Sequence, residues 1–147
     1  SGAIAGNADF ATALLAAGEP WRTTLAYGES PTAPGLHVMD APTAHPTEIS
    51  TGLGGSGVQV MVGHIDSFPS HAHPLVPLLQ VSGSDTGLAR FGGDLDVELD
   101  ASRSPEALVA VLEQRIGAVA SRAYRPSLST AGVVDFQMTR GLLGVST

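Results

Sequence analysis

The chain has 147 residues, of which 43% are hydrophobic, and its formal net charge is −7. This length and apolar content are typical of one compact folded domain and argue against a disordered chain. The acidic balance argues against nucleic-acid binding, and the absence of cysteine excludes disulfides and thiolate metal sites. No apolar run reaches the roughly 20 residues that a membrane span needs. We therefore expect a soluble, cytoplasmic protein that binds neither nucleic acid nor membrane.

The first half of the chain alternates between helix and strand patterns. Asn7 can cap a short helix, and residues 23–27 and 36–39 are rich in strand formers. Pro46 is a typical first residue of a second helix. Residues 58–62 read Val-Gln-Val-Met-Val, a nearly continuous apolar run. This run predicts a buried, central strand of a parallel sheet.

The second half continues the same alternation. Residues 78–81 give another strand, and residues 94–100 alternate acidic and apolar side chains, as in a half-buried strand or an extended loop. Ser104 and Pro105 begin the clearest helix, whose apolar stripe runs to Val119. Alternating helices and strands predict an α/β fold. We expect a single three-layer, Rossmann-like domain over residues 1–147, with a mostly parallel sheet.

One glycine-rich segment matches a dinucleotide-binding motif in the wrong structural context. Residues 52–57 fit the string G-x-G-x-x-G. That motif needs a strand before it and a helix after it, so that the helix amino terminus meets the pyrophosphate. Here a predicted helix precedes the glycines and a predicted strand follows them. The segment therefore predicts a helix end rather than a cofactor site.

Residues 64–74 gather three histidines and an aspartate, in the order His-Ile-Asp-Ser-Phe-Pro-Ser-His-Ala-His-Pro. The donors come in pairs two residues apart, which would let imidazole and carboxylate groups hold a zinc-like or iron-like ion. His71 and His73 are the candidate metal ligands of this loop, with His64 and Asp66 as further donors. Serine, proline and histidine are also ordinary loop residues, so a solvated surface loop is the alternative.

Several segments match, in chain order, the motifs of one known protein family. Residues 35–42, Gly-Leu-His-Val-Met-Asp-Ala-Pro, are similar to a G-L-x-F-M-D-T-P strand. Further matches are residues 48–52 to an S-x-T-G helix end, 55–60 to an A-G-A-Q strand entry, 77–81 to P-x-I-K-V, 94–97 to D-M-D-V, and 132–144 to a closing G-x-x-D/E-F…G stretch. Together these segments resemble the C-terminal domain of the altronate and galactarate dehydratases, over nearly the whole chain.

The resemblance implies an Fe(2+)-dependent hydro-lyase that removes water from a small sugar acid. In such a reaction a base takes the proton next to the carboxylate, and the metal assists the loss of hydroxide. Family members are longer, and a preceding domain supplies much of their active site. We therefore expect this chain to need such a domain or a partner chain, to be inactive alone, and to allow a homo-oligomer. No iron ligand is assigned within it.

Two departures from the family pattern concern substrate binding. The family has Thr-Thr-Gly-Arg-Gly where this chain has residues 62–66, and Gln80 replaces a family lysine. Open α/β sheets bind ligands beyond the carboxyl ends of their strands, and this loop follows a predicted central strand. The candidate substrate-binding residues are Gly63, His64, Asp66, Ser67 and Asp96. Because the lost groups could hold a carboxylate, a stand-alone binding or interaction module without catalysis is the alternative function.

Overall fold

The structure is a computed structural model, and it describes residues 12, 23–42, 44–67 and 71–137. The chain divides into two compact units: unit 1 comprises Ser1–Gly57 and Gln137–Thr147, and unit 2 comprises Val58–Phe136. All strand pairs within the described residues are parallel, and helices lie between and after the strands along the chain. The coarse α/β class is therefore confirmed. The single-domain organisation stays a prediction.

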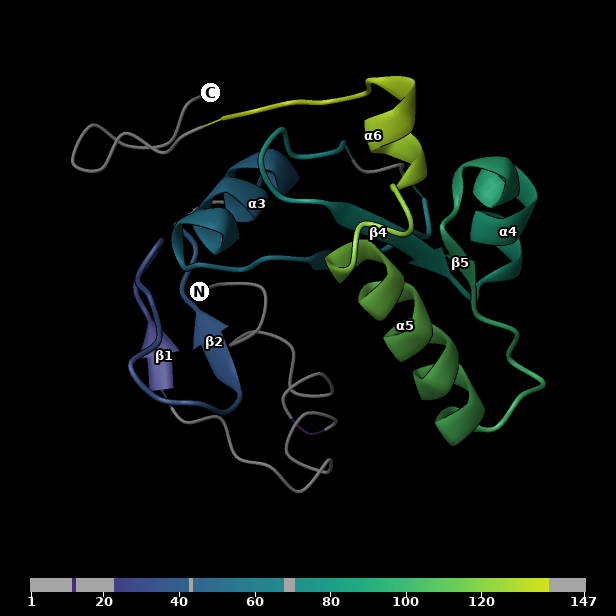
Figure 1. The fold of residues 1–147 in the computed structure, drawn as a ribbon, viewed down its shortest axis with the longest axis horizontal. Helices are drawn as coiled ribbons and strands as arrows, with labels where there is room; N and C mark the ends of the chain where they lie inside the picture. The colour runs from purple at the N-terminus through teal and green to yellow at the C-terminus, as the bar shows by residue number, and fades with distance from the viewer. Residues whose placement is uncertain (1–11, 13–22, 43, 68–70, 138–147) are drawn as a thin grey trace. The chain divides into compact units, whose positions relative to one another are not determined.

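Unit 1 holds a parallel pair of short strands and a helix (Figure 1). Strand β1 (Thr23–Leu25) pairs with β2 (His37–Met39), and helix α3 (Pro46–Gly55) follows. These three elements were predicted, and Pro46 begins α3 as expected because its missing N–H has no partner to lose there. The helix predicted after Asn7 lies outside the described residues.

The Tyr27 side chain connects the turn after β1 to helix α3 through a hydrogen bond. Its hydroxyl donates a hydrogen bond to the Glu48 carbonyl oxygen at 2.6 Å. A Cβ atom added to Gly52 would overlap the Tyr27 ring, so only glycine allows this close approach. Because Gly52 lies inside α3, the G-x-G-x-x-G segment is a helix end without a preceding strand, as predicted.

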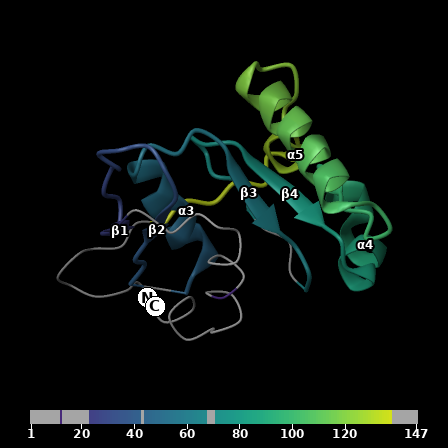
Figure 2. The same ribbon diagram turned by 90° about the horizontal axis from the view of Figure 1, so that it is seen from below.

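Unit 2 is built on a three-stranded parallel sheet with the strand order β3-β4-β5 (Figures 1 and 2). The strands are β3 (Met61–His64), β4 (Leu78–Ser82) and β5 (Val97–Glu98). The other elements are helices α4 (Asp85–Phe91), α5 (Pro105–Ala120) and α6 (Ser127–Ala131) and the 3-10 turn η1 (Gly92–Asp94). All five residues of β4 are buried, so this strand forms the centre of unit 2.

The strand predicted at residues 58–62 lies further along the chain. Strand β3 begins at Met61 and forms an edge of the described sheet, where Val62 is 46% exposed. The prediction of a central, buried strand at residues 58–62 is therefore wrong. The central strand is β4, because it has neighbours on both sides and Leu79 is 0% exposed. An apolar run alone cannot show which strand has two neighbours.

The helices of unit 2 include one that was predicted and two that were not. At the start of α5, the Ser104 hydroxyl accepts a hydrogen bond from the Ala107 N–H at 3.3 Å, as its capping position predicts. Helices α4 and α6 have only 7 and 5 residues, too few to give a clear helical period. In the part of the chain that the structure describes, no helix is long and apolar enough to cross a membrane.

The central position of β4 predicts unequal costs for two truncations in the same sheet. Leu79→Ala should lower the free energy of unfolding by about 2–5 kcal/mol, because it leaves a cavity in a buried site. The control Val62→Ala should cost less than about 1 kcal/mol, since its side chain is half in solvent. Urea unfolding of the two variants measures both values, and equal losses would contradict the central placement of β4.

Candidate functional site

The carboxyl ends of β3, β4 and β5 meet at one edge of unit 2 because the three strands are parallel. The hydrogen-bond ladder continues beyond the strands. The Ile65 N–H donates to the Val81 carbonyl oxygen at 2.8 Å, and the Leu99 N–H donates to the Ser82 carbonyl oxygen at 2.7 Å. The loops that leave these strands therefore emerge at a shared edge, which is where open parallel sheets bind ligands. We call it the carboxyl edge of unit 2.

Asp66 and Ser84 join the loops after β3 and β4 at this edge. The Ser84 hydroxyl donates to Asp66 Oδ1 at 2.6 Å, and the Ser67 hydroxyl donates to Asp66 Oδ2 at 3.2 Å. The same Ser84 oxygen accepts from the Gly87 N–H at 3.0 Å, which caps α4. The Ser84 hydroxyl thus connects the start of α4 with the Asp66 carboxylate, and the hydrogen bond that it accepts and the one that it donates strengthen each other.

The hydrogen bonds keep Asp66 ionised. Donation from Ser84, and then from Ser67, lowers the pKa of Asp66, and the nearby His64 contributes a smaller effect in the same direction. A carboxyl group of lowered pKa is a weak base, so it is poorly suited to proton abstraction near neutral pH. An exposed, ionised carboxylate is well suited to accept hydrogen bonds from the hydroxyl groups of a ligand.

Gly87 allows the first turn of α4 to close on the carboxyl edge. A Cβ atom at this position would overlap the Ser82 hydroxyl and would lie 2.8 Å from the Ile65 carbonyl oxygen. It would also lie 2.9 Å from the Ser84 hydroxyl oxygen. Any larger residue would therefore push α4 away and break the contact between Ser84 and the loop after β3.

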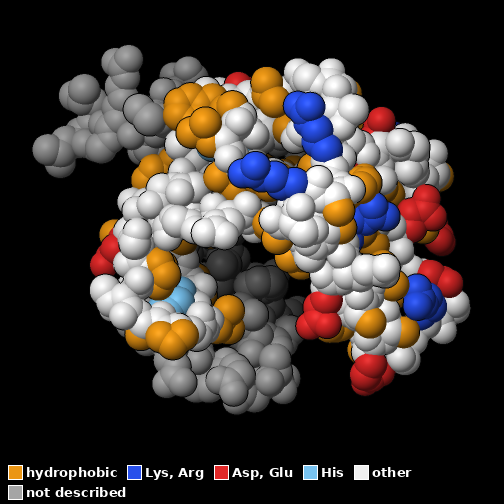
Figure 3. All heavy atoms as spheres, in the orientation of Figure 1, with side chains coloured by type: hydrophobic (Ala, Val, Ile, Leu, Met, Phe, Trp, Pro, Cys, Tyr) orange, Lys and Arg blue, Asp and Glu red, His pale blue; other side chains and the backbone are white. Residues whose placement is uncertain are grey.

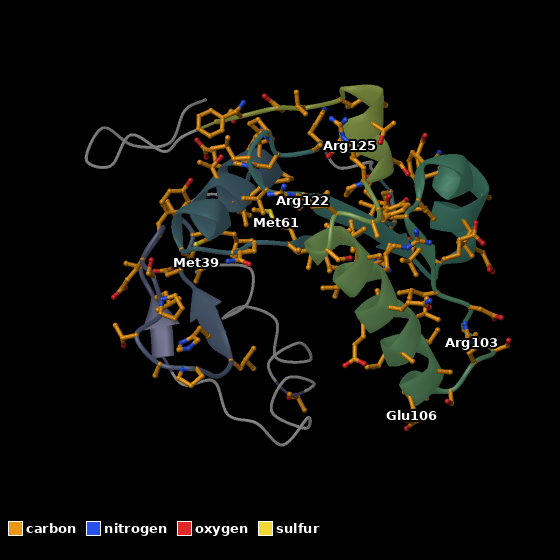
Figure 4. All side chains as sticks on the ribbon, in the orientation of Figure 1. Met39, Met61, Arg103, Glu106, Arg122 and Arg125 are labelled. Carbon is orange, nitrogen blue, oxygen red and sulfur yellow. The ribbon has the colours of Figure 1, made fainter. Side chains whose placement is uncertain are left out.

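A second carboxylate at this edge is held in a similar way. Asp100 follows β5, and its Oδ1 accepts from the Ser102 hydroxyl at 2.7 Å and from the Ser102 N–H at 2.9 Å. These bonds lower the pKa of Asp100, and the charge of Arg103 lowers it further. Arg103 and Glu106 lie beside the start of α5 (Figure 4). The carboxyl edge thus presents two ionised acids and several hydroxyl groups, a set that suits a polyhydroxylated ligand.

The structure brings together four of the predicted substrate-binding residues. Gly63 lies in β3 and His64 ends it, and Asp66 and Ser67 follow in the next loop. His64, Asp66 and Ser67 are exposed at the carboxyl edge. Sequence reasoning missed Ser84, although a serine after an apolar strand is a common helix cap.

Asp96 has a different environment from the other candidates. It precedes β5, is 4% exposed, and accepts from the Gln80 N–H at 2.8 Å. Its other oxygen accepts from the Tyr124 hydroxyl at 2.7 Å, and from the Ser127 N–H at 2.8 Å and hydroxyl at 3.0 Å. Burial and the bond to Asp96 raise the pKa of Tyr124, so this phenol remains a donor. These contacts give Asp96 a structural role, tying β4 and the chain between α5 and α6 to the start of β5.

The connection from α5 to α6 carries two arginines, Arg122 and Arg125 (Figure 4), and blue arginine side chains gather on this face of the molecule (Figure 3). Arg122 has a φ of 61°, in the left-handed region that non-glycine residues rarely adopt. The Arg115 guanidinium lies 4.1 Å from the centre of the Tyr124 ring, and Arg125 donates to the Ser129 carbonyl oxygen at 3.2 Å. Together with the bonds to Asp96, these contacts define the path of the connection.

The two histidines considered as metal ligands have unlike surroundings. His71 is exposed, whereas His73 is 6% exposed and its Nδ1 accepts from the N–H groups of Leu75 and Val76, both at 3.2 Å. If a metal ion bound Nε2, the proton of the neutral ring would have to lie on Nδ1. Nδ1 already accepts hydrogen bonds from two N–H groups, so it has no place for that proton. Across residues 23–42, 44–67 and 71–137, no group of three or more His, Asp or Glu could hold a metal ion. The described residues therefore do not fit an iron site.

Glu48 is a buried acid in unit 1. It lies in the first turn of α3 and is 0% exposed. Neither of its carboxylate oxygens has a hydrogen-bond partner among the described residues. The amino end of a helix favours a negative charge, which partly offsets the loss of hydration. The sequence could not predict this burial, because a single acidic residue in a helix pattern does not show which side faces the core.

No family model matches this chain, and no curated protein matches it. The link to the dehydratases therefore rests on the motifs quoted above. It stays a prediction, and the carboxyl edge of unit 2 has to be interpreted from its own contacts.

The hydrogen bond between Ser84 and Asp66 predicts a shift that can be measured by titration. Ser84→Ala should raise the pKa of Asp66 toward that of a free aspartate, because Ser84 is the main cause of its depression. The pKa is lowered in the folded state, so this bond stabilises the fold above about pH 4 and is lost as the pH falls through the folded pKa. Carbon-13 NMR of the carboxyl groups measures the shift. The control Ser102→Ala should shift Asp100 and leave Asp66 unchanged.

The four hydrogen bonds to Asp96 predict that its replacement destabilises the fold. Asp96→Asn should lower the free energy of unfolding by about 2–4 kcal/mol, because an amide group would face buried donors. Asp94→Asn, an exposed change two residues earlier, is the control and should be nearly neutral. Thermal unfolding distinguishes the two variants. Unchanged stability in Asp96→Asn would show that the residue is free to serve a ligand.

Proposed function

We propose that this chain is the carboxyl-terminal part of a sugar-acid dehydratase, acting on altronate, galactarate or a related hydroxy acid. The observation that carries the proposal is the Asp66–Ser84 pair at the carboxyl edge of unit 2. Asp66 lies in the segment that takes the place of the family's glycine-rich loop, and Ser84 follows the next strand, β4. The ordered resemblance along the chain supports the same reading. A Rossmann-like, three-layer arrangement of the whole chain belongs to this proposal.

The proposed role of the carboxyl edge is to bind the hydroxyl groups of the substrate. Asp66 is ionised and exposed, and each oxygen accepts one internal hydrogen bond, from Ser84 or Ser67. Each carboxylate oxygen has two lone pairs, so both oxygens can also accept a hydroxyl of the sugar acid. The exposed His64 ring at the same edge offers a further polar group. These contacts would orient the carbon chain relative to the reacting groups.

The chemical step requires groups beyond this edge. The acids here have lowered pKa values, which suits binding more than proton abstraction. The described residues also do not assemble a set of metal ligands. We therefore assign the iron, and the base that removes the proton next to the carboxylate, to the preceding domain or to a partner chain. The chain alone would then bind substrate without turning it over.

A dehydration assay tests this function. The full-length protein that contains this chain is incubated with ferrous ion and a series of hexonates and hexarates, and formation of the 2-keto-3-deoxy acid is followed. Asp66→Asn should lower kcat/KM by about 10- to 100-fold, the value of one or two hydrogen bonds to a charged group. Glu113→Gln, an exposed acid on α5, is the matched control and should leave kcat/KM unchanged.

The assay separates the two functions that the sequence allows. Turnover that depends on Asp66 supports the dehydratase. Binding of hydroxy acids by the full-length protein without turnover would instead support a non-catalytic binding module. No turnover of any substrate in the series would overturn the proposed function.

A further inference from the structure

A small hollow lies on one side of helix α5, and none of its lining residues belongs to the carboxyl edge. It has a volume of about 220 Å³ and is lined by Val111, Gln114, Arg115 and Ala118. The last three follow Val111 at three, four and seven residues, a spacing that places all four on one side of the helix. The volume is below the roughly 300–1,000 Å³ of drug-sized ligand sites, so it suits a small molecule. We call it the α5 hollow.

The Arg115 side chain in the α5 hollow is positioned by an aromatic ring. Its guanidinium carbon lies 4.1 Å from the centre of the Tyr124 ring. The Tyr124 hydroxyl donates to Asp96 Oδ1 at 2.7 Å, which holds the ring in place. A guanidinium that lies over a ring face keeps the N–H donors along its own edges available. Arg115 therefore offers a preorganised set of donors to a ligand.

Within the part of the chain that the structure describes, no acidic side chain is paired with Arg115. The contact with the Tyr124 ring is its own, and it forms no hydrogen bond or ion pair there. Asp96, the acid bonded to Tyr124, already accepts four hydrogen bonds from its neighbours. The whole chain has 7 basic and 14 acidic side chains, so an arginine without an acidic partner is not explained by a shortage of acids. Such a cation can pair with an anionic ligand.

We propose that the α5 hollow binds a small carboxylate with a short aliphatic chain. The planar guanidinium of Arg115 can donate to both oxygens of a carboxylate at once. The Gln114 amide adds a group that can donate or accept a further hydrogen bond. Val111 and Ala118 lie about one helical turn to either side of Arg115, so their methyl groups would contact the aliphatic chain. None of the four lining residues is acidic, so none repels the anion.

Butyrate is the probe for this site, because it has one carboxylate and a short apolar tail. Calorimetric titration into the full-length protein that contains this chain should show saturable binding. Arg115→Gln should weaken this binding by about 10- to 100-fold, because the charge-assisted hydrogen bonds are lost. Arg103→Gln is the matched control, since it removes the same charge from a residue beside the start of α5 and outside the hollow. It should change the Kd by less than about twofold, because solvent screens a distant charge.

A second pair of variants tests the space of the α5 hollow rather than its charge. Ala118→Leu fills the hollow and leaves the guanidinium in place, so it should also weaken butyrate binding. Ala120→Leu adds the same side chain at an exposed position of the same helix and should have no effect. This pair also decides the matter should Arg115→Gln fail to fold.

The outcomes do not involve turnover, so they are independent of the proposed function. Weaker binding in both Arg115→Gln and Ala118→Leu, with both controls unchanged, supports the site. Absence of butyrate binding, or binding that Ala118→Leu leaves unchanged, overturns it. Two further probes test the ligand class. Butylamine, which has the same tail and the opposite charge, should not bind, and inorganic phosphate should bind more weakly than butyrate. Equal binding of either probe overturns the assignment of an aliphatic carboxylate.

Discussion

The parallel pairing of β4 with both β3 and β5 is the constraint on which the rest of unit 2 depends. Parallel strands need crossover connections, so each chain segment returns to the opposite end of the sheet before the next strand begins. The loops that follow the three strands therefore share one edge, and α4 begins there. Burial of the whole of β4 stabilises this arrangement. The position of the candidate site is therefore determined by the parallel direction of the strands more than by any single residue.

Serine hydroxyl groups at this edge both stabilise the local structure and hold the acidic side chains in position. Ser84 caps α4 through the Gly87 N–H and also donates to Asp66, so the helix start and the acid are positioned by one oxygen. Ser102 holds Asp100 in a comparable way after β5. Both acids are kept ionised by neutral donors, without a buried ion pair. Such acids remain open to a ligand because hydroxyl donors occupy only part of their accepting capacity.

Buried polar groups divide into two kinds in this protein. Both carboxylate oxygens of Asp96 accept hydrogen bonds from neighbouring residues, so replacing Asp96 should mainly lower the stability of the fold. His73 and Glu48 carry buried polar atoms without partners in the described chain, so their burial costs stability. Groups of the second kind are common where a protein binds or transforms a ligand, because a ligand can supply the missing partner. The contrast is invisible in the sequence, where all three are simply polar residues.

The sequence by itself determined the α/β class, the helices that begin at Pro46 and Pro105, and the strand in β4, because caps and apolar runs act over a few residues. It also placed Asp66 and Ser67 in a loop after a strand. Only the tertiary structure decided which strand is central, since Val62 and Leu79 look alike until their neighbours are known. The pairing of Asp66 with Ser84, 18 residues apart, likewise required the strands to be assembled. The tautomer of His73 depends on how its loop turns back on itself, and no local pattern specifies that path.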